Sequence, residues 1–352
     1  MPRQSCRESA PVFPRTRYQG SKRKLAAAIV AHTRGLEFTT VLDAFGGTGA
    51  VSHAFKRAGK AVTYNDILAF NHQIGRALIE NDERKLSRDE LQWLIGRHAD
   101  VTYGDTIERL FDGIYYPRAE NRWLDMVVAN IQGIADESGK ALAWHALFQA
   151  AMAKRPYNLF HRRNLYMREA DVPRSFGNKT TWEKPFAEHF KHFAREANMA
   201  VFRGEHACRA IRVDAMSAPT DFDLVYIDPP YMNARGQSVD YRHFYHFLEG
   251  MMDYDCWSSR IDFASKHRRL LTSANPWSEK DSIRKMFWEL LSRFNAANIV
   301  VSYRSDGVPS IEELTSLVEG MRRKVAVIKL SANPYVLSTN QCSAEVLMVM
   351  PR

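Results

Sequence analysis

The sequence has few of the features that mark disulfide-stabilised, zinc-binding or membrane proteins. Its four cysteines, Cys6, Cys208, Cys256 and Cys342, are far apart and form no C-x-x-C pair. No window approaches the roughly 18 apolar residues of a membrane span, and residues 1–17 lack the apolar core of a secretory signal. We therefore expect no metal site and no disulfide framework, and a reducing cytoplasm as the compartment.

The chain is otherwise of ordinary globular composition, with an excess of positive charge. It has 352 residues, of which 45% are hydrophobic and 25% charged, and its formal net charge is +9. Residues 151–212 contain 13 Lys and Arg against 6 Asp and Glu. Aromatic residues are interleaved with these charges: Tyr157, Phe160, His161, Tyr166, Phe176 and Trp182. This mixture suits phosphate contacts and base stacking, and a solvated helical surface is the alternative interpretation.

The first part of the chain has the pattern of a parallel nucleotide-binding sheet. Ser21 is placed to cap a helix over residues 22–33. A buried strand over residues 39–45 is followed by a glycine turn and a helix over 50–58, closed by Gly59. Residues 60–65 form a second strand that ends at Asp66. This order of strand, loop, helix and strand predicts an α/β fold.

A long helical stretch separates this unit from the remaining strands. Residues 67–210 show helical patterns, for example over 89–99, 120–138 and 138–153, and no clear strand. Ser310 and Glu313 form a capping box at the head of a later helix. Strand patterns return at 223–228, 269–273, 298–304, 324–330 and 344–350. We therefore predict one sheet domain, formed by 1–66 with 211–352, and an insertion at 67–210.

The loop "DAFGGTG" after the first strand predicts a nucleotide-type ligand. Gly47 and Gly49 allow the backbone to approach a ligand, and Asp66 ends the next strand, where a carboxylate can accept hydrogen bonds from both ribose hydroxyls. The third fingerprint position is Ser52 and not glycine, which disfavours a dinucleotide. An adenosyl ligand without pyrophosphate fits better, and a plain tight turn is the alternative.

The stretch "DLVYIDPPY" ends a buried strand with groups suited to an aromatic amine. Asp228 lies where catalytic groups occur in open parallel sheets. Pro229 and Pro230 fix two φ angles and keep their carbonyl oxygens in place as acceptors. Tyr231 offers a flat surface for a planar ring. An acid-capped, proline-rich turn is the alternative.

These motifs occur in the order "YQGSK", "DAFGGTG", "YND" and "YIDPPY". In this order the sequence resembles the alpha group of DNA adenine-N6 methyltransferases, which use S-adenosylmethionine. The N-terminal motif matches at Tyr18, Gly20, Ser21 and Lys22, and the cofactor and D-P-P-Y motifs match throughout. "VSYRSDGVPSIEEL" also looks like the C-terminal part of such enzymes. The resemblance covers residues 17–66 and 211–350, and more loosely "KRPYNLFHRRNLYMR".

The resemblance implies a Rossmann-like methyltransferase sheet with a target-recognition insertion and S-adenosylmethionine as cofactor. Asp43 and the loop glycines are expected at its methionine end, and Asp66 at its ribose. Asp214 is expected near its adenine, although a surface aspartate fits the same pattern. Tyr18 and Lys22 are expected to close over the cofactor, although Lys22 also reads as a solvated lysine. The cofactor-binding set is Tyr18, Lys22, Asp43, Phe45, Gly47, Gly49, Asp66 and Asp214.

The resemblance also implies a reaction. Asp228 and the Pro229 carbonyl would accept hydrogen bonds from the exocyclic amine of adenine and draw it toward tetrahedral geometry. Because that amine is paired inside a duplex, the base must be flipped out, with Tyr231 stacking on it. Candidate contacts to phosphates or bases are Arg155, Asn158, His161, Arg162, Arg163 and Asn164.

The expected partners are double-stranded DNA and restriction or defence proteins. Two other functions stay open at this point. One is a methyltransferase acting on RNA or on another planar amide or amine, against which the N-terminal lysine motif and the long insertion argue. The other is a DNA-binding protein on a decayed methyltransferase scaffold, against which the intact Asp228-Pro229-Pro230 motif argues.

Overall fold

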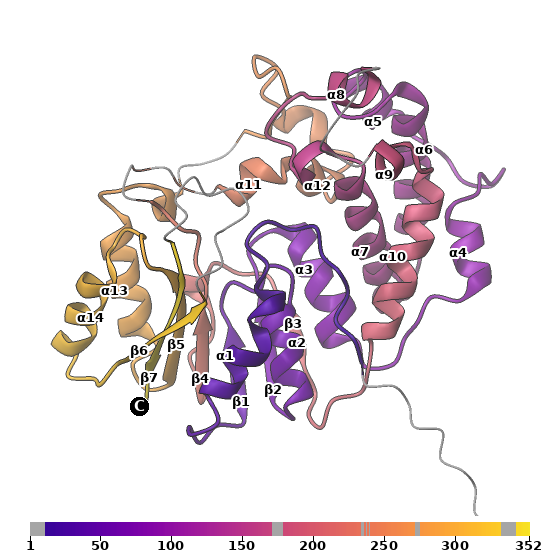
Figure 1. The fold of residues 1–352 in the computed structure, drawn as a ribbon. Coiled ribbons are helices and arrows are strands. Elements are labelled where there is room, and N and C mark those ends of the chain that lie inside the picture. The colour runs from indigo at the N-terminus through magenta and orange to yellow at the C-terminus, as the bar shows by residue number, and fades with distance from the viewer. Residues whose placement is uncertain are drawn as a thin grey trace, which may run out of the picture.

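The computed structural model describes residues 11–170, 179–233, 236, 238, 240–271, 275–331 and 343–352. Cys6, Phe176 and Cys342 lie outside the described residues. A seven-stranded sheet has helices on both faces, and a helical unit stands beside it (Figure 1). This arrangement confirms the predicted α/β class, a Rossmann-like sheet flanked by helices. Within the described ranges, no helix is long and apolar enough to cross a membrane.

The sheet has the strand order β3-β2-β1-β4-β5-β7-β6. Neighbours from β3 to β5 are parallel, whereas β7 runs antiparallel to both β5 and β6. The carboxyl ends of β1, β2 and β4 therefore meet at one edge, and the first residue of β7 lies at the same edge. The bounds are β1 Thr40–Asp43, β2 Ala61–Asn65, β3 Arg209–Ile211, β4 Leu224–Ile227, β5 Asn298–Arg304, β6 Ala326–Ser331 and β7 Glu345–Met350.

Two strand predictions were wrong. β3 lies partly inside the stretch for which no strand was expected, because its three residues are an edge strand too short and too exposed to show an alternating pattern. The strand expected over 269–273 is absent from its described part, residues 269–271, where Leu270 makes only an isolated bridge with Ile261. Residues 272 and 273 lie outside the described residues.

Alternate side chains of the strands pack on opposite faces of the sheet. Leu224 and Tyr226 of β4 belong to one hydrophobic cluster, and Val225 and Ile227 to the other. The first cluster includes residues of α1 (Ala26–His32), α2 (Ala50–Arg57) and α3 (Ala69–Gly75). The second includes α13 (Ile283–Arg293) and α14 (Ile311–Gly320). The strands therefore read as continuous apolar runs because both of their faces are buried.

Of two predicted helix starts, one is confirmed and the other differs from the prediction. The capping box of α14 is confirmed, because Glu313 N donates to Ser310 Oγ at 3.2 Å and Ser310 N donates to Glu313 Oε2 at 2.7 Å. The helix expected from Lys22 instead begins with a 3-10 turn, η1 (Lys22–Lys24), and continues as α1. The Ser21 side chain makes no cap hydrogen bond and contacts Thr48 Oγ1 at 3.2 Å.

The helical unit surrounds α7, which is buried on nearly all sides. Its predicted span of 138–153 is confirmed, and Asp136 caps its N-terminus. The helices and turns after α3 are η2 Arg76–Glu80, α4 Arg88–Leu94, α5 Thr106–Leu110, α6 Arg118–Gln132, α7 Glu137–Ala153, η3 Pro156–Asn158, α8 Tyr166–Glu169, α9 Lys179–Glu183, α10 Phe186–Ala200, η4 Ala215–Ser217, α11 Tyr241–Phe244, α12 His246–Met251, η5 Trp257–Arg260 and η6 Pro276–Ser278.

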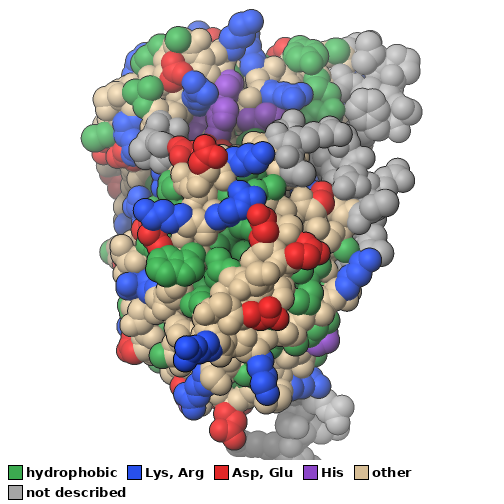
Figure 2. All heavy atoms as spheres, turned by 90° about the vertical axis from the view of Figure 1, so that its left-hand side faces the viewer, with side chains coloured by type: hydrophobic (Ala, Val, Ile, Leu, Met, Phe, Trp, Pro, Cys, Tyr) green, Lys and Arg blue, Asp and Glu red, His purple; other side chains and the backbone are tan. Residues whose placement is uncertain are grey.

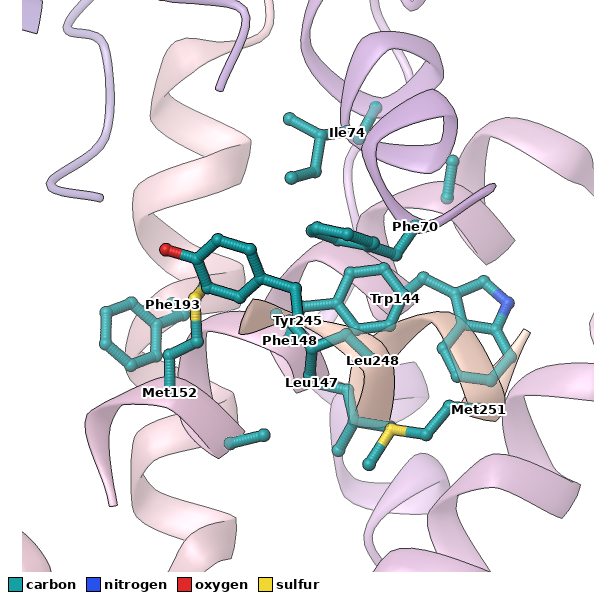
Figure 3. Close-up of a cluster of buried hydrophobic side chains, with 14 of the residues drawn as sticks. Phe70, Ile74, Trp144, Leu147, Phe148, Met152, Phe193, Tyr245, Leu248 and Met251 are labelled. Carbon is teal, nitrogen blue, oxygen red and sulfur yellow. The ribbon is translucent and has the colours of Figure 1, made fainter. Parts of the chain in front are cut away.

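One apolar cluster joins the helical unit to the sheet domain (Figure 3). Phe70 of α3 packs against Phe148 of α7 at 5.7 Å and against Tyr245, which precedes α12, at 5.6 Å. Phe247 of α12 packs against Phe111 and other aromatic rings of the helical unit. Residues 241–251 therefore pack with the helical unit, although the sequence assigned them to the sheet domain, and α3 packs on the sheet, although it was assigned to the insertion.

Candidate active site

The loop after β1 has the tight geometry that its glycines predicted. Gly47 and Gly49 have φ values of 49° and 74°, in the left-handed region that favours glycine. A Cβ at Gly46 would lie 2.1 Å from the Tyr64 ring, so this position has no room for a side chain. The loop passes directly over Tyr64, whose hydroxyl donates to the Gly47 carbonyl at 2.7 Å. The sequence therefore brings the backbone of this loop close to whatever the adjoining cavity holds.

Asp43 is the last residue of β1, and one of its two buried carboxylate oxygens accepts a hydrogen bond. Its Oδ2 accepts a 2.6 Å hydrogen bond from Ser52 Oγ, which explains why serine replaces the third fingerprint glycine. Among the described residues, nothing donates to its buried Oδ1. Burial, with the nearby charges of Asp228 and Asp66, raises the pKa of Asp43 to about 7, against the lowering effect of Ser52. An incoming cation is the natural partner for such a carboxylate.

Asp66 lies just beyond β2 and is held by three donors. Its Oδ2 accepts from Gly47 N and Asn71 Nδ2, both at 3.0 Å, and its Oδ1 accepts from Leu68 N at 2.9 Å. Burial raises its pKa to about 6 despite these hydrogen bonds. A carboxylate has about four lone-pair sites, so Asp66 keeps acceptor capacity for a ligand hydroxyl.

Lys22 and the D-P-P-Y motif come together at the carboxyl end of β4. Lys22 Nζ donates to Asp228 Oδ1 at 2.9 Å and to the Tyr231 hydroxyl at 2.6 Å. The Tyr231 hydroxyl also donates to Asp228 Oδ1. Lys22 is buried, which excludes the solvated lysine that its position in a first helical turn allowed. Two donors therefore fix the same oxygen of the Asp228 carboxylate.

Tyr231 does not present its ring to a ligand in this structure. It is 5% exposed, Lys22 Nζ lies 4.9 Å from its ring centroid, and Tyr303 packs edge-on at 5.4 Å. The side chain is instead used through its hydroxyl. Glu345 was not among the site residues predicted from the sequence. Its Oε1 lies 3.4 Å from both Lys22 Nζ and the Tyr231 hydroxyl. No local pattern distinguishes this glutamate from a polar residue at the start of a strand.

Tyr18 belongs to a stack of three tyrosines, two of which, Tyr18 and Tyr241, line the site. Its ring lies 5.4 Å from Tyr241 and 4.6 Å from Tyr245, with nearly parallel planes. Its hydroxyl accepts from Asn71 Nδ2 at 3.3 Å. The sequence prediction identified Tyr18 alone, although the run "DYRHFYHF" that follows the D-P-P-Y motif is an aromatic signal that was available.

A cavity of about 260 Å³ brings these groups together at the carboxyl edge of the sheet. Gly49, Pro229 and Tyr231 are not among the residues that line it. Asn71, Tyr241, Arg242 and Trp277 line it as well and were not predicted. The predicted site residues that line the cavity are Tyr18, Lys22, Asp43, Phe45, Gly47, Asp66, Asp214, Asp228 and Pro230.

Asp214 reaches this cavity from the segment after β3. Its side chain is exposed, and Oδ1 accepts from Met216 N at 2.9 Å, which caps the short turn η4. Both readings of the sequence therefore apply, since Asp214 is a surface capping residue and also a lining residue of the cavity. Within the described ranges, no group of three or more His, Cys, Asp or Glu side chains is arranged to hold a metal ion.

The candidate DNA contacts of the insertion divide into buried and exposed residues. Arg155 is 1% exposed, and its guanidinium donates to the carbonyls of Leu159 and Arg162 and lies 4.5 Å from the Tyr115 ring centroid. It is a structural residue, so its prediction as a direct DNA contact is wrong for this structure. Asn164 is also buried.

The remaining candidates are accessible. Arg162 and Arg163 are exposed, and His161 and Asn158 are half-buried. Asn158 and its neighbour Tyr157 have φ values of 59° and 63°, so two successive non-glycine residues adopt the left-handed conformation.

Figure 2 shows histidine side chains gathered on one face of the molecule, with Lys and Arg side chains nearby. Positive charge on such a face suits a polyanion.

Known proteins that are similar to this chain are DNA methyltransferases. A family model described as D12 class N6 adenine-specific DNA methyltransferase matches residues 18–256. The type II methyltransferase M2.HphI of Haemophilus parahaemolyticus is 26% identical over 91% of this chain and 91% of its own length.

Two longer relatives are also similar to most of the chain. The modification methylases LlaI of Lactococcus lactis subsp. lactis and StsI of Streptococcus sanguinis are 25% and 23% identical over 93% and 86% of it. The chain spans about half the length of these two, 52% and 46%. Because the family model covers more than half of the chain, including both the glycine loop and the D-P-P-Y motif, the protein belongs to the D12 class of N6 adenine-specific DNA methyltransferases.

Proposed function

We propose that this adenine-specific DNA methyltransferase takes its methyl group from S-adenosylmethionine, acts on a base flipped out of duplex DNA, and serves a restriction-modification or phage-defence system. The observation that carries the proposal is the cavity that Asp43, Asp66 and the pair Lys22–Asp228 share at one sheet edge. Its expected compartment is the cytoplasm, as the sequence suggested.

The residues around the cavity fit S-adenosylmethionine. Asp43 Oδ1 is a buried acceptor without a donor among the described residues, and it suits the ammonium of the methionine part. Asp66 is proposed to accept from a ribose hydroxyl, and Asp214, which lines the cavity, is proposed to accept from the adenine amine of the cofactor. Phe45, Gly47 and Tyr18 line the cavity as well, and Gly49 shapes the loop. When bound, the cofactor supplies a methyl group on a positively charged sulfur.

The D-P-P-Y motif is proposed to bind and orient the adenine amine. Lys22 and Tyr231 hold Asp228 by Oδ1, so Oδ2 is proposed to accept one N–H of the amine and the Pro229 carbonyl the other. These acceptors draw the nitrogen toward tetrahedral geometry and aim its lone pair. Positive charge develops on that nitrogen during the reaction, and acceptors fixed beside it stabilise it most in the transition state. Asp228 is the proposed acceptor of the proton that the methylated amine must lose.

The DNA is proposed to contact the helical unit near the mouth of the cavity. Arg162 and Arg163 are the proposed phosphate contacts, with His161 and Asn158 beside them, because these four are accessible. We take the recognition unit as residues 81–208 together with 240–271, because Phe244 of α11 contacts His161 and Phe247 of α12 contacts Phe111. Names of the relatives, "type II methyltransferase" and "modification methylase", support a cognate nuclease as partner.

A transfer assay tests the proposal. The protein is incubated with methyl-labelled S-adenosylmethionine and duplex DNA, single-stranded DNA or RNA, beside Asp228→Ala and the matched variant Asp221→Ala, which changes an exposed acid before β4. Label is expected on adenine N6 of duplex DNA, for the wild type and Asp221→Ala only. Preferred labelling of RNA, or equal labelling by Asp228→Ala, overturns it. Sequencing that detects methylated adenine then gives the recognition site.

A further inference from the structure

Glu345 is a buried carboxylate at the edge of the sheet where the reaction groups meet. It is the first residue of β7 and is 3% exposed. Because β7 runs antiparallel to β5, its first residue pairs with Arg304, the last residue of β5. The inversion of one strand thus places Glu345 at the carboxyl end of its parallel neighbours, beside Lys22 and Tyr231.

Glu345 contacts both groups that donate to Asp228 Oδ1. Lys22 Nζ lies 2.9 Å from Asp228 Oδ1 and 3.4 Å from Glu345 Oε1, so one ammonium faces two carboxylates. The Tyr231 hydroxyl lies 3.4 Å from the same Oε1, so Glu345 contacts both of the donors that hold Asp228 Oδ1. A buried carboxylate in contact with both donors is placed to fix their orientation.

We propose that Glu345 is a positioning residue for methyl transfer. It holds Lys22 from the side away from Asp228, so that the ammonium reaches only Oδ1 of that carboxylate. Oδ2 then stays available to the adenine amine. This inference rests on the proposed function, because it assumes that Asp228 accepts the amine. Without Glu345, Lys22 is expected to settle between both oxygens of Asp228 and to compete with the amine for Oδ2.

Two substitutions separate the hydrogen bond from the charge. Glu345→Gln keeps an acceptor oxygen near Lys22 but removes the charge, and Glu345→Met removes both in about the same volume. The measurements are the single-turnover methylation rate at saturating duplex DNA, the Kd for S-adenosylmethionine by calorimetry, and the Tm.

For Glu345→Met we expect a cofactor Kd within about threefold of wild type and, at a temperature well below the Tm of the variant, a rate lower by about 10- to 100-fold, because an interaction needed only for transfer is lost. Glu345→Gln is expected to keep a rate between the two. Asp223→Asn is the control, because Asp223 is a half-buried carboxylate at the amino end of β4, where it accepts from the amide and the hydroxyl of Thr40. It should lower the Tm and leave the rate at saturating DNA unchanged.

A Glu345→Met variant with the wild-type rate overturns the inference, as does a rate loss explained by weaker cofactor binding or by partial unfolding at the assay temperature. If the wild type itself methylates no DNA, the proposed function fails, and a crystal structure of Glu345→Met decides separately on Glu345. Lys22 Nζ is then expected within hydrogen-bond distance of both Asp228 oxygens. An unmoved Lys22 in that structure overturns the positioning role.

Discussion

Lys22 and Asp228, 206 residues apart in the chain, form an ion pair in which Nζ lies 2.9 Å from Oδ1. The pair joins the N-terminal motif to the D-P-P-Y motif. It also changes the role expected for Lys22, which the resemblance places over the cofactor. A lysine that closes over a cofactor contributes mainly to cofactor affinity, whereas a lysine that holds Asp228 contributes mainly to the transfer step.

Lys22→Met distinguishes these roles. We expect the single-turnover rate to fall by about 10²- to 10³-fold, the size of effect seen when one donor of a preorganised site is removed. The Kd for S-adenosylmethionine, measured by calorimetry, should change by less than about tenfold. Lys24→Met is the control, because Lys24 is an exposed lysine in the same 3-10 turn. A large loss of cofactor affinity with an unchanged rate would favour the role over the cofactor.

Tyr231→Phe tests whether this residue acts through its ring or its hydroxyl. If stacking on the flipped base is its role, phenylalanine retains most of the activity. Because the ring is buried and the hydroxyl joins Lys22 to Asp228, we expect the single-turnover rate to fall by about 10- to 100-fold. Tyr116→Phe is the matched control, since it removes another buried tyrosine hydrogen bond, to the Ala151 carbonyl, away from the cavity. Wild-type activity in Tyr231→Phe would restore the stacking role.

The sequence predicted the parts of the fold that depend on local pattern. Six of the seven strands lie within one or two residues of their predicted bounds, and the capping box at Ser310 is present. The glycine loop and the D-P-P-Y strand end could be predicted because few residue types adopt the backbone conformations that they require. β3 was missed because a three-residue edge strand has too short a pattern.

The direction of a strand and the burial of an individual side chain could not be predicted from the sequence. Glu345 lies at the site only because β7 runs antiparallel to β5, and no residue pattern within β7 predicts that direction. Arg155 reads like its neighbours Arg162 and Arg163 in a basic segment, yet the fold encloses it among aromatic rings. Both are properties of tertiary packing, which a linear pattern does not record.

Asp43 is expected to lower the stability of the ligand-free protein at high pH. Burial raises its pKa to about 7 from an ordinary value near 3.8, so the folded protein binds this proton more tightly than the unfolded chain. The stabilising effect is complete below pH 4 and is lost as the pH rises through about 7. Asp43→Asn removes this dependence and should gain on the order of 2–4 kcal/mol relative to wild type at pH 8, with little gain at pH 4.

Urea unfolding of wild type and Asp43→Asn at both pH values measures this difference. Asp66, whose pKa is raised to about 6, adds a dependence of the same sign in both proteins, so most of it cancels in the comparison. An equal gain at the two pH values would show that Asp43 does not titrate in this range.

Arg155→Ala is expected to act on stability and not on DNA directly. The substitution leaves the carbonyls of Leu159 and Arg162 without their donor and removes a cation from the face of Tyr115. We expect a loss of about 3–5 kcal/mol in the free energy of unfolding, as for other broken buried polar networks. Denaturant titration measures it. Full stability together with weaker DNA binding would return Arg155 to the set of DNA contacts.

The double variant Arg162→Ala/Arg163→Ala tests the proposed phosphate contacts. Each lost contact should lower the slope of log K against log salt by about 1, so the double variant should lose up to about 2 and bind duplex DNA more weakly across all sequences. Fluorescence anisotropy at several salt concentrations measures both quantities. The control is Arg34→Ala/Arg57→Ala, which removes the same charge from exposed positions after α1 and at the end of α2, just before β1 and β2 begin. Because these positions lie at the amino ends of the strands, away from the cavity, the control should keep the wild-type slope within experimental error. Equal losses in the two double variants would mean that net charge alone, and not this surface, holds the DNA.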